Sequence, residues 1–184
     1  MNKIGIFFGT ETGTTRLIVK KLQKKLGDEI AAKPINVNRI EPEEMLQYDA
    51  LILGTPSYGE GQIPGASAGC FEPNWEEFLV KMPQADFSGK RVALFGLGAQ
   101  ERYSERFASS LKALYDVFKG FGAEIVGDTS TEGYTFQHSA AVVDGRFVGL
   151  VIDQRTQGMF TDERIDAWLK VVTPLLLEKL TVEA

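Results

Sequence analysis

Short apolar runs alternate along this chain with longer amphipathic segments, and that alternation limits the possible fold more than any other feature. Residues 3–8, 50–53 and 91–97 have the mostly apolar character of buried strands, and a glycine follows each run. In residues 14–26 and 161–180 the apolar side chains recur at helical spacing, which predicts two amphipathic helices. Apolar strands that alternate with helices form parallel βαβ units, in which helices cover both faces of the sheet.

The remaining segments continue the same alternation. We expect two further strands, over residues 34–37 and 124–126, and three further helices, over residues 41–46, 74–81 and 105–121. Strands and helices in this order predict a doubly wound α/β fold. No low-complexity tract or linker interrupts residues 1–184, so we expect a single domain.

Residues 128–153 break this alternation near the fifth strand. Two apolar runs, residues 140–143 and 146–152, flank the dipeptide Asp144-Gly145. Asp-Gly between two apolar runs is a strong signal for a β-hairpin, so we expect an inserted β excursion. Two roles stay open for it: a flap that adds stability, or a surface on which a partner protein docks.

The composition excludes several classes of function. Cys70 is the single cysteine and His138 the single histidine, which excludes an internal disulfide, a multi-histidine metal site and a structural zinc site. The net charge of −5 argues against nucleic acid or an anionic membrane as the main partner. The longest apolar run near the N-terminus, residues 4–8, is too short for a signal peptide or a membrane span. We therefore expect a cytoplasmic protein.

The first candidate loop joins the strand at residues 3–8 to the helix at residues 14–26. It has the sequence Gly-Thr-Glu-Thr-Gly-Thr-Thr from residue 9 to residue 15. Backbone N–H groups at a helix N-terminus favour an anion, and threonine hydroxyls add donors, so the loop is a candidate phosphate site. It lacks the lysine and the spacing of a nucleoside-triphosphate loop, which argues against ATP or GTP hydrolysis. The alternative is that the threonines only form the turn and cap the helix.

Two further loops leave predicted strands. The second loop, residues 54–61, carries Tyr58 in the middle of a glycine-rich turn, and Tyr58 alone is compatible with a simple turn tyrosine. The third loop, residues 96–103, carries Tyr103 and has Glu101 where a dinucleotide-binding fingerprint needs its third glycine. Two loop aromatics and one phosphate loop point to a flat phosphorylated cofactor, bound where the strands of a doubly wound sheet end.

Taken together, the three loops resemble those of the long-chain flavodoxins. Residues 10–15 match the phosphate loop of that family, and residues 55–58 match its second loop with serine in place of threonine. The third loop matches at Gly96, Gly98, Gln100 and Tyr103. The likeness covers nearly the whole chain, and an insertion near the fifth strand is the long-chain feature. It implies a five-stranded parallel sheet in the order 2-1-3-4-5, with helices on both faces, and FMN as a non-covalent cofactor.

The resemblance assigns cofactor-binding roles residue by residue. It implies that the first loop holds the FMN phosphate, that Tyr58 and Tyr103 flank the isoalloxazine ring, and that the second and third loops hydrogen-bond its edge. It also implies that the Gly59 carbonyl turns toward flavin N5 when one electron is taken up. The residues expected to bind the cofactor are Thr10, Glu11, Thr12, Gly13, Thr14, Thr15, Thr55, Pro56, Ser57, Tyr58, Gly59, Gly61, Gly96, Leu97, Gly98, Gln100 and Tyr103.

Two positions of the third loop depart from the family pattern. Ala99 stands where family members usually have aspartate, and Arg102 stands where a small or neutral residue is common. The first change removes a negative charge near the flavin edge, and the second adds a positive one. We therefore expect the second reduction step to have a less negative potential than in relatives with the usual residues.

The resemblance implies a low-potential one-electron carrier that works as a monomer, without a substrate of its own. The expected partners are redox proteins, namely a flavin or iron–sulfur reductase as donor and an acceptor oxidoreductase. Nitrogen fixation, biosynthetic reduction and protection from oxidative stress all stay open as settings. The alternative is a flavin-dependent NAD(P)H:quinone oxidoreductase, which would need a nicotinamide site. A third class, a binding module that has lost its flavin, conflicts with the intact first loop.

Overall fold

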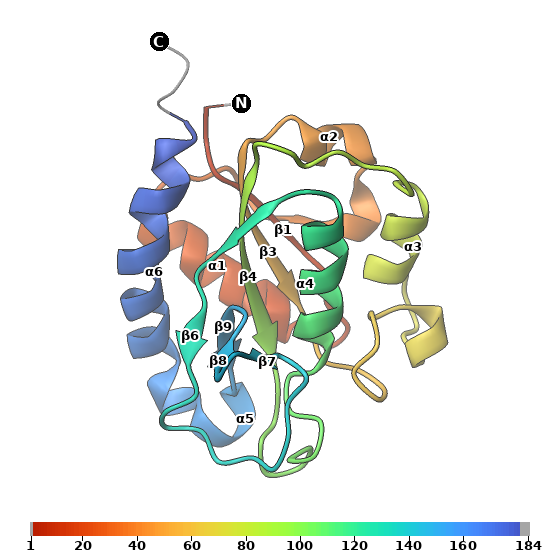
Figure 1. Ribbon diagram of the computed structural model, residues 1–184, viewed down its shortest axis with the longest axis vertical. Coiled ribbons are helices and arrows are strands. Elements are labelled where there is room, and N and C mark those ends of the chain that lie inside the picture. Colours follow the sequence, from red (N-terminus) through yellow and green to blue (C-terminus); the bar gives the residue numbers. More distant parts are fainter. Residues whose placement is uncertain (1, 181–184) are drawn as a thin grey trace.

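Five parallel strands form the centre of the computed structural model, which describes residues 2–180 (Figure 1). They are β1 (Gly5–Phe8), β2 (Ile35–Asn36), β3 (Ala50–Thr55), β4 (Arg91–Leu97) and β5 (Glu124–Val126). Their order is β2-β1-β3-β4-β5, and each neighbouring pair is parallel. The predicted fold and strand order are therefore confirmed, although β1 and β2 are shorter than the sequence pattern indicates.

The position of the fifth strand is divided between two segments. β5 pairs with residues 91–93 of β4, and β9 (Leu150–Ile152) pairs with residues 95–97 of the same strand. Residues 127–149, called the insertion below, therefore separate the two halves of the fifth strand, as predicted. The prediction that residues 146–152 form one continuous strand of the hairpin is wrong. Residues 146–147 pair in a separate sheet, whereas residues 150–152 pair with β4.

The insertion carries its own antiparallel sheet. β6 (Thr129–Ser130) and β7 (Val142–Val143) both pair with β8 (Arg146–Phe147). Asp144 and Gly145 connect β7 to β8 with φ angles of 52° and 79°. Positive φ at both central residues is the signature of a type I′ turn, so the predicted Asp-Gly hairpin is confirmed.

Helices cover both faces of the central sheet (Figure 1). α1 (Thr14–Leu26) and α6 (Thr161–Glu178) pack on one face, and α3 (Trp75–Val80) and α4 (Ser110–Gly120) pack on the other. α2 (Pro42–Leu46) lies between β2 and β3 in the chain. The other helical turns are α5 (Gln154–Gln157) and three 3₁₀ turns at residues 37–39, 66–68 and 158–160.

The core lies on both sides of the sheet because strand side chains alternate between its faces. Ile6 and Ile52 pack with α1 and α6, whereas Phe7 and Leu53 pack with α3 and α4. All four side chains are fully buried. The continuous apolar runs of the sequence thus supply buried side chains to both faces, as a sheet covered by two helix layers requires.

The two tryptophans, Trp75 and Trp168, belong to this core. Trp75 is 0% exposed and Trp168 is 3% exposed. The indole N–H of Trp75 donates to the Gly54 carbonyl at 2.9 Å, and that of Trp168 donates to the Gly127 carbonyl at 2.9 Å. Each buried ring therefore has its one polar group satisfied.

The start of α4 differs from the prediction. The apolar spacing predicts a helix over residues 105–121, but α4 begins only at Ser110. Ala108 has a φ of 52°, a left-handed conformation that does not continue a right-handed helix. Phe107 is fully buried against Phe136 and Phe147 of the insertion. Contacts with the insertion therefore override the local helical preference of residues 105–109.

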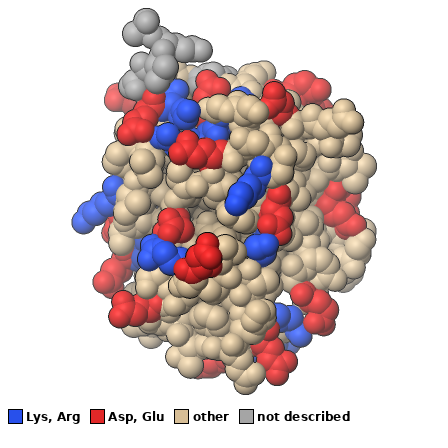
Figure 2. Space-filling view, viewed as in Figure 1, with Lys and Arg blue, Asp and Glu red and all other residues tan. Residues whose placement is uncertain are grey.

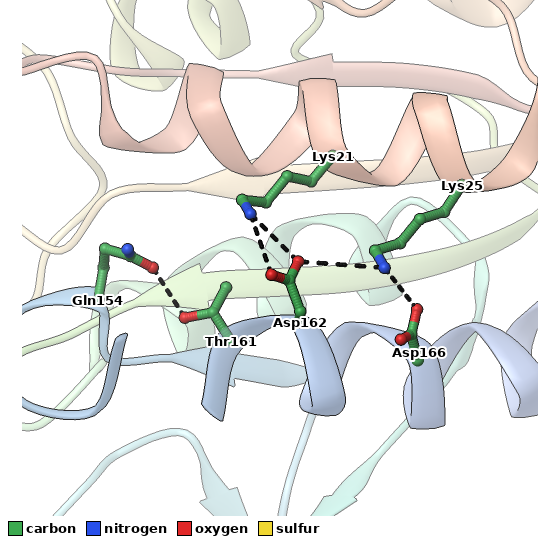
Figure 3. A network of polar contacts seen from close by, with 6 residues as sticks. All are labelled: Lys21, Lys25, Gln154, Thr161, Asp162 and Asp166. Atoms are coloured by element: carbon green, nitrogen blue, oxygen red, sulfur yellow. Dashed lines mark hydrogen bonds and ion pairs between the residues drawn. The ribbon is translucent and has the colours of Figure 1, made fainter. Parts of the chain in front are cut away.

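Surface ion pairs join α1 to α6 (Figure 3). Lys21 Nζ lies 3.1 Å from Asp162 Oδ1, and Lys25 Nζ lies 2.7 Å from Asp166 Oδ1. Both aspartates are exposed, so each pair contributes little to stability. The same view shows Thr161 Oγ1 donating to Gln154 Oε1 at 2.7 Å, which links α6 to α5.

Candidate functional site

A cavity of about 340 Å³ lies at the carboxyl ends of β1, β3, β4 and β9. All three predicted loops reach it, and so does α5. This edge of a doubly wound sheet is where such folds bind ligands. The lining residues are Glu11, Thr12, Thr14, Pro56, Ser57, Tyr58, Leu97, Gly98, Ala99, Tyr103, Ile152, Gln154 and Arg155.

The first loop presents unpaired donors at the N-terminus of α1. Gly13 precedes the helix with a φ of 94°, and no side chain caps it. The Thr10 hydroxyl accepts a hydrogen bond from the Gly13 amide at 3.1 Å, so Thr10 shapes the loop instead of lining the cavity. Thr15 Oγ1 is buried and has no hydrogen-bond partner among residues 2–180. An unpaired buried hydroxyl beside an uncapped helix N-terminus fits an anion such as a phosphate.

Glu11 lies in the first loop but its carboxylate is turned to the protein. Oε1 accepts a hydrogen bond from the Phe71 amide at 2.9 Å, which ties the first loop to the segment before α3. Oε2 is buried without a hydrogen-bond partner among residues 2–180. Because a carboxylate repels a phosphate, only the backbone of Glu11 suits the anion that this loop fits.

The second loop places Pro56, Ser57 and Tyr58 on the cavity. The Tyr58 amide donates to Ser110 Oγ at 3.4 Å, at the start of α4. Burial raises the pKa of the Tyr58 hydroxyl above its usual value, and the nearby Glu11 carboxylate raises it further. Tyr58 therefore stays a neutral aromatic ring at physiological pH.

The glycines of the second loop shape it without lining the cavity. Gly59 has a φ of 58°, a conformation in which a residue with a side chain is strained. Gly61 has a φ of 91°, and a Cβ there would lie 2.5 Å from Ser109 Cβ. Thr55 is buried, and its hydroxyl donates to the Pro56 carbonyl at 2.9 Å.

The third loop places Leu97, Gly98, Ala99 and Tyr103 on the cavity. Gly96 is buried in β4, where a Cβ would lie 3.0 Å from Leu111 Cβ. The Tyr103 ring is 39% exposed, as a ring that covers a ligand from outside would be. Two guanidinium groups flank it, with Arg102 at 5.3 Å and Arg106 at 5.2 Å from the ring centroid. Arg102 thus lies over the ring instead of extending away from it.

Gln100 is predicted to bind the cofactor, but it does not line the cavity. Its side chain is buried and donates to Asp153 Oδ2 at 2.9 Å. Its Oε1 accepts a hydrogen bond from the Thr135 amide of the insertion at 2.6 Å. The side chain therefore connects three segments of the protein behind the third loop.

Three lining residues were not predicted from the sequence, namely Ile152 at the end of β9 and Gln154 and Arg155 in α5. These residues could have been predicted, because all strands of a parallel sheet end at the same ligand-binding edge. The prediction failed because the insertion separates β9 from β5 in the sequence, so the second half of the fifth strand was not recognised. Arg155 matters most, since it adds a cation to the cavity lining.

The single cysteine and the single histidine lie outside the cavity lining. Burial raises the pKa of the half-buried Cys70 thiol, which disfavours a reactive thiolate. His138 is exposed in the insertion. Within residues 2–180 no cluster of His, Cys, Asp or Glu is arranged to hold a metal ion, and no helix is long and apolar enough to cross a bilayer.

Comparison with known proteins agrees with this geometry. The family model described as Flavodoxin matches residues 6–168. The chain belongs to the flavodoxin family. A flavodoxin of Klebsiella pneumoniae is 45% identical over 177 residues, which cover 96% of this chain and 100% of that protein. A flavodoxin of Enterobacter agglomerans is 47% identical over 178 residues, with the same coverage of both chains.

A solved structure shows the same architecture. The Fusobacterium nucleatum flavodoxin bound to flavin mononucleotide superposes with a TM-score of 0.83 and is 34% identical, covering 95% of this chain and 98% of that one. The Klebsiella pneumoniae and Enterobacter agglomerans relatives match 96% of this chain over their whole lengths, so they are about as long as this chain. The resemblance to long-chain flavodoxins that the three loops indicate is therefore confirmed.

Proposed function

We propose that the cavity holds FMN non-covalently and that the protein carries single electrons between redox proteins. Bound FMN takes up and releases electrons one at a time. The observation that carries the proposal is that one cavity is bounded both by the uncapped start of α1 and by Tyr58 and Tyr103. The FMN-bound relative supports the same cofactor.

The residues of the cavity suit the two ends of FMN. The N–H groups at the start of α1 and the hydroxyls of Thr12, Thr14 and Thr15 are the donors expected to bind the phosphate. Tyr58 and Tyr103 are the rings expected to flank the isoalloxazine. Gly13, Gly59 and Gly61 are expected to act through the backbone conformations of the loops.

A carrier role also fits what lies around the cavity. Its polar lining consists of hydroxyls, one amide, one carboxylate and one guanidinium, without a histidine or cysteine to act as proton shuttle or nucleophile.

Acidic and basic side chains are intermixed on the face shown in Figure 2, with no extended patch of one sign. Redox-protein partners, a monomeric state and a cytoplasmic location stay predictions.

The test is to load the purified protein with FMN and titrate it with dithionite under anaerobic conditions. We expect one FMN per chain and reduction in two separate one-electron steps. Steady-state oxidation of NAD(P)H with a quinone, measured without any partner reductase, should be negligible. Failure to bind FMN, or rapid quinone reduction by the protein alone, would overturn the proposal in favour of the quinone oxidoreductase.

A further inference from the structure

The segment between β4 and α4 carries Tyr103 but has little secondary structure of its own. Residues 98–109 form no helix or strand, so their backbone groups need hydrogen-bond partners outside regular secondary structure. Some of these bonds are local, such as that from the Tyr103 amide to the Ala99 carbonyl, and others come from the insertion. The segment is called the tyrosine segment below.

Backbone hydrogen bonds attach the insertion to the tyrosine segment. The Ser104 carbonyl accepts from the amides of Gln137 and His138, both at 2.9 Å. The Phe107 amide donates to the His138 carbonyl at 3.1 Å. Two hydroxyls of the segment add to this attachment, because Ser104 Oγ accepts from the Gln137 amide at 2.9 Å and Ser109 Oγ accepts from the Ala140 amide at 3.3 Å.

Aromatic packing reinforces the attachment. The Phe107 ring lies 5.2 Å from Phe136 and 6.1 Å from Phe147, measured between ring centroids. Phe107 and Phe147 are both 0% exposed. The tyrosine segment and the insertion therefore share one small buried cluster, so movement of one requires movement of the other.

Gln100 is the point where this attachment reaches the residues beside the cavity. The Asp153 carboxylate is 0% exposed and accepts from the Gln100 amide and from Gln100 Nε2, each at 2.9 Å. The other carboxylate oxygen, Asp153 Oδ1, accepts from the Thr156 amide at 2.8 Å, and this bond caps the start of α5. Gln100 Oε1 accepts from the Thr135 amide of the insertion. A buried carboxylate requires such donors, so the arrangement is held tightly.

We propose that Gln100 is a positioning residue, through which the insertion and Asp153 set the conformation of the tyrosine segment against the flavin. The inference rests on the proposed function and adds a role for the insertion. Ala99 and Tyr103, which line the cavity, flank Gln100 closely in sequence. A displaced Gln100 therefore displaces the wall of the cavity without touching the cofactor itself.

The experiment replaces Gln100 by leucine, which keeps a similar volume but removes both side-chain hydrogen bonds. The rate of FMN release from the loaded protein is followed by the fluorescence of the freed flavin. We expect release about tenfold faster, because a buried carboxylate loses one donor and a backbone amide loses its acceptor. FMN and riboflavin should be affected by the same factor, since the phosphate loop is unchanged.

The matched control is Gln23→Leu. The Gln23 side-chain amide also donates to a carboxylate, that of Asp28, but on the exposed surface at the end of α1. We expect its FMN release rate to equal that of the unaltered protein within a factor of two. A similar acceleration in both variants would mean that Gln100 has no special role.

A double-mutant cycle with Tyr103→Ala separates positioning from general weakening. If Gln100 acts through the tyrosine segment, Gln100→Leu should accelerate release less than twofold once the Tyr103 ring is absent. Equal acceleration in both backgrounds would overturn the proposal. If the unaltered protein binds no FMN, the proposed function fails instead, so the two failures are distinguishable.

A second variant covers the case in which Gln100→Leu does not fold. Gln100→Glu places two carboxylates at hydrogen-bond distance, and one proton shared between them restores the contact. FMN release from this variant should therefore slow toward that of the unaltered protein as the pH falls from 7 toward 5. An acceleration that does not depend on pH would contradict the arrangement.

Discussion

Arg106 and Glu60 form an ion pair at 3.2 Å that joins the tyrosine segment to the second loop. The same guanidinium lies 5.2 Å from the centroid of the Tyr103 ring. Arg106 is therefore in contact with both loops that carry a cavity tyrosine. The side chains are 38% and 77% exposed, so solvent screens their attraction.

We expect this pair to add little to stability. Glu60→Gln and Arg106→Gln should each lower the free energy of unfolding by less than about 1 kcal/mol. Urea unfolding of both single variants and the double variant gives the coupling energy, which should disappear in high salt. A coupling above about 2 kcal/mol would show that the pair is shielded from water.

Thr15 is expected to act on binding without supporting the fold. Thr15→Val removes a buried hydroxyl that has no partner among residues 2–180, so the unfolding free energy of the flavin-free protein should stay equal or rise. FMN affinity should fall by roughly 1–3 kcal/mol, because a donor to a charged phosphate is lost. Thr12→Val should weaken FMN similarly. Riboflavin is the control ligand, and an equal loss for riboflavin would remove both hydroxyls from the phosphate site.

Gly59 is expected to affect the largest fraction of the protein that is reduced by one electron during a reductive titration. Its φ is already 58°, so valine would be strained even before the peptide turns. Gly59→Val should lower the maximum one-electron fraction seen by absorbance during reduction, and Gly59→Ala should lower it less. An unchanged fraction in the valine variant would exclude the Gly59–Glu60 peptide from the process.

The arginines near the cavity are expected to raise the potential of the second reduction step. Arg155 lines the cavity, and Arg102 lines an adjoining one together with Arg155 and Ala99. Removing a cation disfavours the extra negative charge, so Arg155→Gln and the double variant Ala99→Asp with Arg102→Gly should each lower that potential. For a one-electron couple about 59 mV corresponds to a tenfold change in the equilibrium constant, which redox titration resolves.

Salt and a distant arginine provide the controls for that prediction. The shifts should shrink at high ionic strength, because both side chains are exposed. Arg39→Gln, an exposed arginine in the 3₁₀ turn after β2, should leave the potential unchanged. A raised or unmoved potential in the cavity variants would place their charges away from the flavin.

Tyr134 is expected to make the protein sensitive to alkali. Burial raises its pKa to about 12, whereas an unfolded tyrosine ionises near pH ~10. Ionisation therefore favours the unfolded chain, and the contribution of Tyr134 is complete below pH ~10 and is lost as the pH rises to about 12, by roughly 2–3 kcal/mol. Urea unfolding at pH 9 and pH 11 measures the first half of this loss, about 1.4 kcal/mol.

Tyr134→Phe should flatten that pH dependence. At neutral pH the variant should be somewhat less stable, because the hydroxyl donates to the Val151 carbonyl of β9 at 2.5 Å. A variant that loses as much stability between pH 9 and pH 11 as the unaltered protein would assign the alkaline transition to another group.

Local patterns in the sequence account for most of the fold and for the loop that we propose binds the phosphate. The continuous apolar runs of β1 and β3 and the helical spacing in α1 follow directly from which side chains must be buried. The Asp144-Gly145 turn and the loop at residues 9–15 are equally local, because a few adjacent backbone conformations define each of them. The identity of the cofactor came from the resemblance to the flavodoxin family, because no pattern of buried side chains specifies a cofactor.

Only the tertiary structure decided how distant segments meet around the cavity. Gln100 and Asp153 are 53 residues apart, and neither position has a local signal for their buried hydrogen bonds. Arg155 reaches the cavity because β9 pairs with β4 beyond β5. Residues 105–109 have a helical pattern but are not helical. Their buried aromatic contacts and backbone hydrogen bonds with the insertion outweigh the weak local preference for a helix.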